Sequence, residues 1–207
     1  TKSYGDTTNG DMFIAKFNSS GVHQWTSTIG GAGADAARSI ITSNDGGLAI
    51  IGDSNSAGWT DGADDIIVAK FDSSGVEQWT NSIGTSASDN GYGIVQAADD
   101  NYYISGSSDM GNTGGDFDML VGKLDSSGAE QWVKTYWKGT GAESGRAIDI
   151  TTDGGFVVTG DTPNAGQGGD DIWLTKFDNT GTQQWSYTYG STTSDKGYAV
   201  RQTADNG

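Results

Sequence analysis

Acidic side chains recur at two positions of this chain, and their type and spacing bear most directly on chemistry. One set stands ten or eleven residues after a Trp: Asp35, Asp89, Glu143 and Asp195. A second set precedes an apolar run: Asp11, Asp65, Asp118 and Asp171. Carboxylates gathered with backbone carbonyls can hold Ca²⁺, which takes six to eight oxygen ligands. The alternative is that each acid accepts hydrogen bonds from loop N–H groups, and the chain has no Asp-x-Asp-x-Asp-Gly loop. Ca²⁺ is therefore the one candidate metal, and no other cofactor is expected.

Ligand contact is expected from loop residues that differ between otherwise similar segments. Variable loops on a rigid scaffold often carry binding residues, and an exposed Trp suits glycan or peptide contact. The alternative for each residue is local packing. The candidates are Trp59, Asp61, Met110, Asn112, Trp137, Lys138, Asn164 and Gln167.

Catalysis is not expected. The chain has no Cys and a single histidine, His23, which lies in a hairpin where the other copies have Glu or Gln. Gly52-Asp53-Ser54 is similar to a hydrolase nucleophile motif, but a triad needs a histidine, and the only one, His23, is expected to be an exposed strand residue. Because no acid, base and nucleophile stand out as a set, we expect a protein that is not an enzyme.

The elements that position these residues are four copies of one repeat. Ala69-Lys70-Phe71-Asp72-Ser73-Ser74-Gly75, with a Gln-Trp pair shortly after it, represents a segment that recurs about every 53 residues. Residues common to every copy are expected to be structural, with each Trp wedged between neighbouring units; a row of sugar-stacking platforms is the alternative. Each Lys is expected to make ion pairs or hydrogen bonds to turn backbone. These positions are Trp25, Trp79, Trp132 and Trp185, then Lys16, Lys70, Lys123 and Lys176, and Gly21, Gly75, Gly128 and Gly181.

Each repeat holds four strand-length segments without helical periodicity. In one copy these are Ala36–Ser43, Leu48–Ile51, Ile66–Phe71 and Val76–Ile83. Four strands per repeat of this length predict an all-β fold, a β-propeller or an arc of one with four-stranded antiparallel blades. The expected units are 1–34 (a partial blade), 35–88, 89–142, 143–194 and 195–207 (the first strand of a further or closing blade). The chain is expected to be a window of a longer propeller or one part of an oligomeric ring.

Two motifs resemble those of known families. Ala69 to Trp79 resembles the tryptophan-docking motif of quinoprotein-type propellers, although the Asp stands one position later here. The Trp, Gly-rich link, Asp and Asp-Gly-Gly pattern resembles the repeats of secreted bacterial and archaeal SBBP-like β-propeller proteins. This resemblance implies a fold and an extracellular or cell-surface location, and it says little about activity.

Composition limits the classes of partner that the chain is expected to bind. The formal net charge is −16, so nucleic acid is not an expected partner, and no apolar run is long enough for a membrane span. We expect a secreted binding module for glycan or extracellular protein, including copies of itself. The alternative is a structural subunit of an extracellular sheath, filament or adhesin stalk, and a fragment of a quinoprotein dehydrogenase or polysaccharide-active enzyme ranks below both.

An alternation on the first strand of each unit has no assigned role. Arg38, Tyr92, Arg146 and Tyr198 occupy equivalent positions and alternate, which suggests duplication of a two-unit segment.

Overall fold

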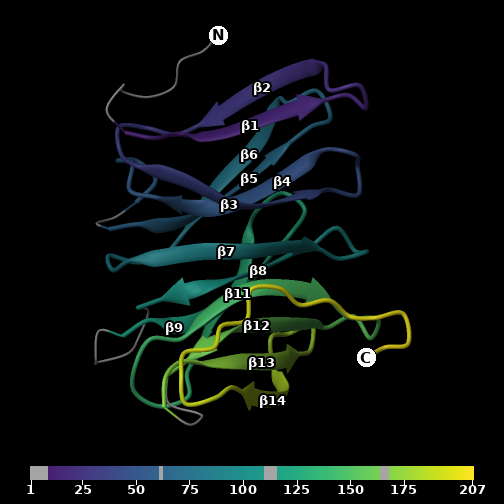
Figure 1. Ribbon diagram of the computed structural model, residues 1–207. Helices are drawn as coiled ribbons and strands as arrows, with labels where there is room; N and C mark the ends of the chain where they lie inside the picture. The colour runs from purple at the N-terminus through teal and green to yellow at the C-terminus, as the bar shows by residue number, and fades with distance from the viewer. Residues whose placement is uncertain (1–8, 61–62, 110–115, 164–167) are drawn as a thin grey trace.

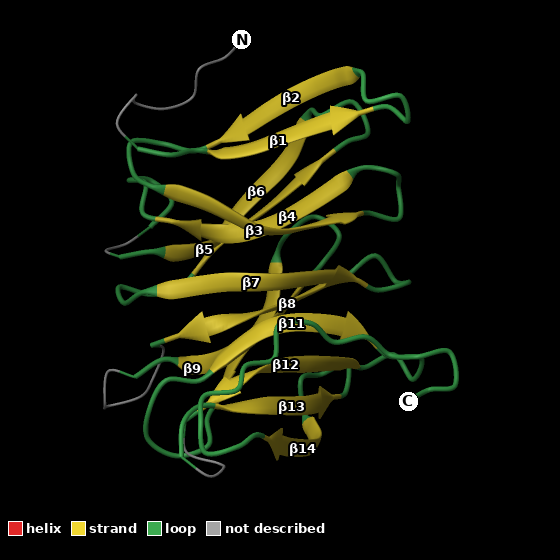
Figure 2. Cartoon of the chain, in the orientation of Figure 1, coloured by secondary structure: helices red, strands yellow, loops and turns green. Residues whose placement is uncertain are grey.

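The computed structural model describes residues 9–60, 63–109, 116–163 and 168–207, and over these residues the protein is all-β, with fourteen antiparallel strands and no helix. The strands form four sheets stacked in series (Figures 1 and 2). The first sheet holds β1 (Met12–Phe17) and β2 (His23–Ile29), and the second holds β3 (Asp35–Thr42), β4 (Leu48–Ser54), β5 (Asp65–Phe71) and β6 (Glu77–Ile83). The third holds β7 (Asp89–Gln96), β8 (Tyr102–Ser108), β9 (Asp118–Leu124) and β10 (Glu130–Tyr136). The fourth holds β11 (Ser144–Ile150), β12 (Phe156–Thr162), β13 (Asp171–Phe177) and β14 (Gln183–Tyr189).

Each four-stranded sheet is a simple meander in which consecutive strands pair. The turns between strands carry glycine at positive φ, as at Gly46 (80°) and Gly75 (83°). This backbone region is open to glycine and strained for most other residues, which explains the recurring Asp-Gly and Ser-Gly pairs. We call the edge of the stack that carries these turns the turn rim.

The core lies between successive sheets rather than within one layer. β5 is buried along its whole length, because sheets cover both of its faces, and its sequence is accordingly a nearly continuous apolar run. Ile66 and Val68 pack with Ile94 and Ile104 of the third sheet, and a second cluster around Phe156 joins the third and fourth sheets.

The strands predicted in the second sheet are confirmed, and β4 continues three residues further than expected, to Ser54. The all-β class is confirmed as well, whereas the closed propeller stays a prediction. Residues 190–207 form no strand, although 195–207 were expected to. They have no neighbouring strand to complete a ladder and instead follow β11, where Gln202 N–H donates to Asp149 at 2.9 Å.

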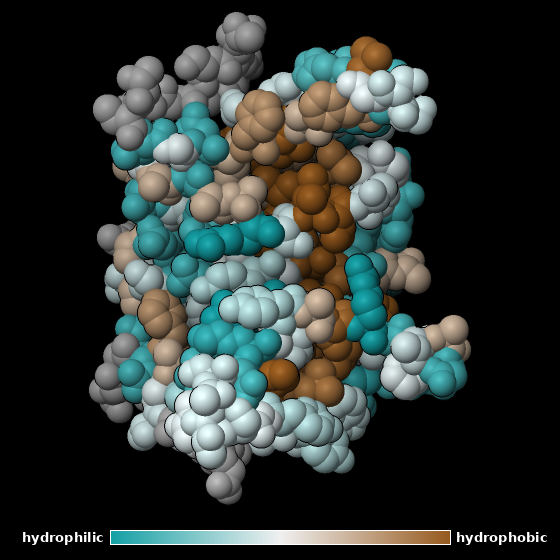
Figure 3. All heavy atoms as spheres, viewed as in Figure 1, coloured by the Kyte–Doolittle hydropathy of each residue, from teal (hydrophilic) through white to brown (hydrophobic). Residues whose placement is uncertain are grey.

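The first strands of the sheets, β3, β7 and β11, contact one another and form one face of the stack. A hydrophobic band runs down this face (Figure 3). Ile40, Ile94, Ile148 and Val200 line a groove of about 320 Å³ on it. None of the described residues forms a helix, so no described segment is a long apolar helix of the kind that crosses a membrane.

Candidate functional site

The repeated acids lie together along one edge of the stack, which we call the acid rim. One backbone hydrogen bond recurs at all four junctions between successive units: the N–H of Asp35, Asp89, Glu143 or Asp195 donates to the carbonyl of Gly10, Asp64, Phe117 or Asp170, at 2.6–2.8 Å. Each acceptor directly precedes the acid that begins the third strand of its unit. The bond therefore brings the two predicted sets of acids together in pairs.

Burial separates these acids from ordinary surface carboxylates. Asp89 is 0% exposed, and Glu143 and Asp171 are each 1% exposed. Asp35 is also buried, and hydroxyl groups of Ser54 and Ser56 donate to it. Asp35 therefore accepts hydrogen bonds from two side-chain hydroxyl groups.

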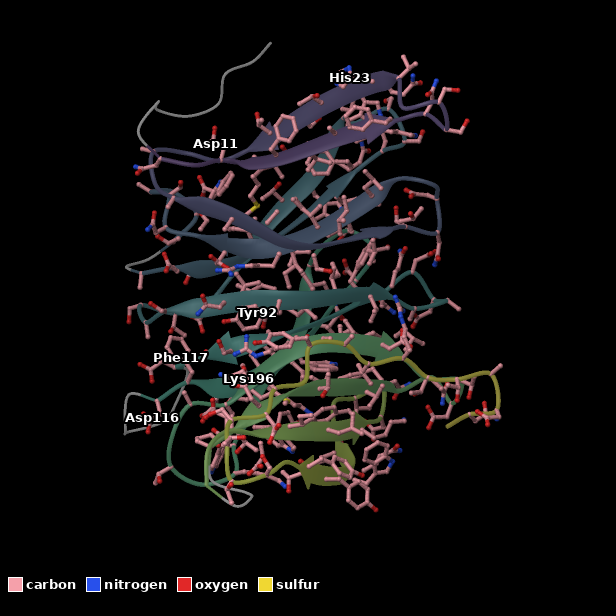
Figure 4. The ribbon with its side chains drawn as sticks, viewed as in Figure 1. Asp11, His23, Tyr92, Asp116, Phe117 and Lys196 are labelled. Atoms are coloured by element: carbon pink, nitrogen blue, oxygen red, sulfur yellow. The ribbon has the colours of Figure 1, made fainter. Side chains whose placement is uncertain are left out.

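A pocket of about 370 Å³ opens on the acid rim between the third and fourth sheets. Its walls come from segments far apart in the sequence, and Figure 4 shows Tyr92, Phe117 and Lys196 on three of them. The lining comprises Asn90, Tyr92, Ser107, Phe117, Gly141, Ala142, Glu143, Ser144, Arg146, Asp161, Pro163, Asp170 and Lys196. This volume falls within the ~300–1,000 Å³ of small-molecule sites.

A charge network centred on Asp161 holds the pocket wall. Arg146 forms an ion pair with Asp161 through Nε, and Ser144 Oγ donates to the same carboxylate at 2.8 Å. Lys196 Nζ lies 3.4 Å from Asp161 and 2.9 Å from Asp170. The Arg146 guanidinium also lies 5.7 Å from the centre of the Tyr92 ring, within cation–π range.

The pKa values of the two buried acids of this pocket, Glu143 and Asp161, are shifted in opposite directions. Burial, followed by the nearby carboxylates of Asp118 and Asp116, raises the pKa of Glu143. Burial also acts to raise the pKa of Asp161, but hydrogen bonds from Arg146 and Ser144 outweigh it and the pKa is lowered. Because cations and a hydroxyl already engage Asp161, it holds the wall in place rather than attacking a substrate. The pocket offers hydrogen-bonding groups and two aromatic side chains, Tyr92 and Phe117, which suits a hydroxyl-rich ligand.

A second repeated feature joins the sheets to one another. Trp25 Nε1 donates to Ser73 O and Trp79 Nε1 to Ser126 O, each at 3.2 Å, so each Trp meets the hairpin turn of the next sheet. The turn glycine packs on the indole, since a Cβ on Gly75 would lie 2.6 Å from the Trp25 ring. Trp132 meets Gly181 in the same way. The structure therefore places three of the repeated Trp residues between sheets.

The residue two positions after each Trp extends this contact. Ser27 Oγ donates to Gly75 O at 2.6 Å, Asn81 Nδ2 to Gly128 O at 2.8 Å, and Lys134 Nζ to Thr180 O at 2.8 Å. The contact, which we call the Trp–turn contact, thus has an aromatic part and a polar part.

Both halves of the Trp–turn contact are open at the ends of the stack. On β14, Trp185, Tyr187 and Tyr189 are 39%, 56% and 55% exposed and stack in a row, with ring centres 5.6 and 6.4 Å apart. On the first sheet, no heavy atom lies within 4 Å of a Cβ built on Gly21, the counterpart of Gly75.

The repeated lysines share one environment in two sheets. Lys70 Nζ forms an ion pair with Asp45 at 2.8 Å, and Lys176 with Asp153 at 2.9 Å. Lys16 instead donates to Ser73 O at 3.1 Å. The ammonium of Lys123 lies 5.1 Å from the centre of the Tyr103 ring.

The loop residues singled out from the sequence do not converge. Trp59 packs against the core cluster below the first sheet, whereas Trp137 is 61% exposed. The Lys138 ammonium lies 5.8 Å from the Trp173 ring centre. Asp61, Met110, Asn112, Asn164 and Gln167 lie outside the described residues. Sequence reasoning did not single out Asp161 or Lys196, and it assigned no role to the alternation to which Tyr92 and Arg146 of this wall belong.

Within the described ranges, no three Asp, Glu or His side chains gather in a group that could hold a metal ion. No protein-family model matches the chain, and no curated protein matches it.

Proposed function

We propose that this chain is a non-enzymatic, extracellular interaction module of the β-propeller type that docks a further unit of its own kind. The supporting observation is the Trp–turn contact, which occurs three times inside the chain and is open at both ends. The β14 row offers the aromatic half, and the turn around Gly21 offers the glycine half. A second copy can therefore repeat at its β1–β2 turn what Gly75 and Gly128 do within the chain.

Such docking joins two different surfaces, so it is heterologous and can close a ring or extend an open assembly. The exposed aromatic row is the kind of surface that dominates interface energetics, because large rigid side chains bury much area. Exposed apolar side chains of β1 also support an interface at the β1–β2 end of the stack. Phe13 and Phe17 are 65% and 57% exposed, whereas Phe71, the counterpart of Phe17 in the second sheet, is 1% exposed.

The test is the solution mass of the protein by light scattering over a concentration series. We expect the mass to rise with concentration and the Trp185→Ser variant to weaken this association at least tenfold, since a central aromatic contributes about 2 kcal/mol or more. Trp137→Ser is the control, because Trp137 is even more exposed than Trp185 (61% against 39%) but lies on the acid rim. A monomer at every concentration, or equal weakening by both variants, would refute the proposal.

The acid-rim pocket favours a second function, the binding of a glycan. Tyr92 supplies an aromatic face, and Asn90, Glu143 and Lys196 supply hydrogen-bonding groups around it. A glycan array followed by calorimetry tests this function. Tyr92→Ala should abolish the binding of any glycan detected, and Tyr189→Ala on β14 should leave it unchanged. An empty array would count against the pocket and leave the docking proposal intact.

A further inference from the structure

Acids of the acid rim meet in pairs at successive junctions. A Cβ built on Gly84 would lie 2.1 Å from Asp65 Oδ1 and 2.8 Å from Asp89 Oδ2, so both carboxylates converge on this glycine. At the next junction Glu143 N–H donates to Phe117 O at 2.7 Å, beside Asp118. At the last, Asp195 N–H donates to Asp170 O at 2.6 Å, beside Asp171.

One acid at each of these junctions has buried oxygens that accept no hydrogen bond. These are Asp89 Oδ1, Glu143 Oε2 and both carboxylate oxygens of Asp171. The residues are 0%, 1% and 1% exposed, and among the described residues the ion pairs involve other acids. A buried carboxylate oxygen that accepts no hydrogen bond is costly, and a second carboxylate beside it adds repulsion. A bound cation would offset this cost at each junction, and at the last one the Lys196 ammonium is already engaged by Asp161 and Asp170.

The described residues at these junctions offer oxygen ligands. Hydroxyl groups lie beside the acids: Thr162 Oγ1 donates to Glu143 at 3.2 Å, and Ser108 interacts with Asp89. Two carboxylates and a hydroxyl fall short of a full shell, so backbone carbonyls and water must supply the rest. Ca²⁺ accepts such mixed shells of six to eight oxygens in flexible geometry, whereas Mg²⁺ demands a near-ideal octahedron.

We propose that the acid rim binds Ca²⁺ at three junctions, between Asp65 and Asp89, between Asp118 and Glu143, and between Asp171 and Asp195. Each ion joins two successive units. At the first two junctions it links the start of the third strand of one sheet to the start of the first strand of the next, and at the last junction it links the start of β13 to the segment that follows β14. The acid rim would thus hold a series of Ca²⁺ ions that join successive units, on the opposite edge of the stack from the turn rim.

Calorimetry with CaCl₂ on the chelator-treated protein tests this proposal. We expect heat of binding that saturates at up to three ions, and MgCl₂ should bind much more weakly. At a Ca²⁺ concentration of about 100 Kd, the Tm should rise by roughly 5–10 °C for each ion bound. Asp89→Asn should lower the number of bound ions by one, and so should Asp171→Asn. Glu130→Gln, an exposed acid of β10 away from the rim, should change nothing.

If a variant fails to fold, luminescence of Tb³⁺ bound to the unaltered protein and displaced by Ca²⁺ gives the same answer. Absence of Ca²⁺ heat together with an unchanged Tm would overturn the proposal, and shared protons would then neutralise the pairs, visible as a Tm that rises with falling pH. An unaltered ion count in both Asp89→Asn and Asp171→Asn would overturn it equally. Trp185→Ser should still bind Ca²⁺, so the outcome is independent of docking at β14.

Discussion

The acid rim and the turn rim carry the same residue types in opposite surroundings. On the turn rim, Asp45 and Asp153 are mostly exposed, with 63% and 56% of their side chains accessible, and each meets a lysine and nearby donors. Lys70, Ser43 and the Gly47 N–H hold the pKa of Asp45 below its ordinary value. On the acid rim, burial raises the pKa of Asp89 and of Glu143.

This difference teaches that acid content alone does not separate structural from functional carboxylates. The turn-rim acids order their own hairpins, because each accepts N–H groups two residues on, as Asp45 does from Gly47 at 2.9 Å. On the acid rim, Asp89 and Glu143 occupy buried positions that oppose their ionisation. A protein gains nothing in stability from such burial unless a ligand or a cation compensates it.

The largest effect is expected at the centre of the pocket wall. Asp161→Ala leaves Arg146 and Lys196 without their shared carboxylate, and we expect the free energy of unfolding to fall by about 3 kcal/mol. Urea unfolding measures it. Asp149→Ala, on β11, is the control, since its partner Arg201 is 81% exposed and such pairs contribute about 1 kcal/mol or less. Equal losses in the two variants would mean that the ion pairs of the pocket wall contribute no more to stability than the exposed ion pair of Asp149.

A smaller effect is expected where two carboxylates crowd one glycine. Gly84→Ala forces its Cβ against Asp65 and Asp89, so we expect a loss of about 2 kcal/mol in the free energy of unfolding. Gly10→Ala, on the same rim, has no heavy atom within 4 Å of its Cβ and should change the free energy by less than about 0.5 kcal/mol. A loss in Gly84→Ala as small as that in Gly10→Ala would show that the carboxylates of Asp65 and Asp89 are loosely packed around Gly84. Thermal unfolding of both variants decides between these outcomes.

The sequence was sufficient to predict the repeat and the strands of the second sheet, because each depends on patterns within about 53 residues. Strand periodicity and turn glycines are local, and the Trp contact repeats from unit to unit. The pocket could not be predicted in the same way. Asp161 differs from Ser107, its counterpart in the third sheet, and Lys196 reaches Asp161 from 35 residues away. Such a site depends on how differences between repeats meet in space, and a repeating pattern does not record those differences.

The smallest effect is a difference in pH dependence between the rims. The raised pKa of Glu143 means that its ionisation opposes folding, so its contribution is least unfavourable at low pH and worsens as the pH rises through the folded-state pKa. The pKa of Asp153 is instead lowered by Thr151 and Lys176, so the ionised Asp153 stabilises the fold and this stabilisation is lost as the pH falls.

Glu143→Gln should therefore raise the Tm near neutral pH and leave it nearly unchanged at acidic pH. Asp153→Asn should lower the Tm near neutral pH, by an amount that shrinks on acidification, and its solvent exposure limits the effect to about 1 kcal/mol. Melting curves across this pH range in the presence of chelator compare the two variants, and shifts of the same sign would mean that the two rims do not differ electrostatically.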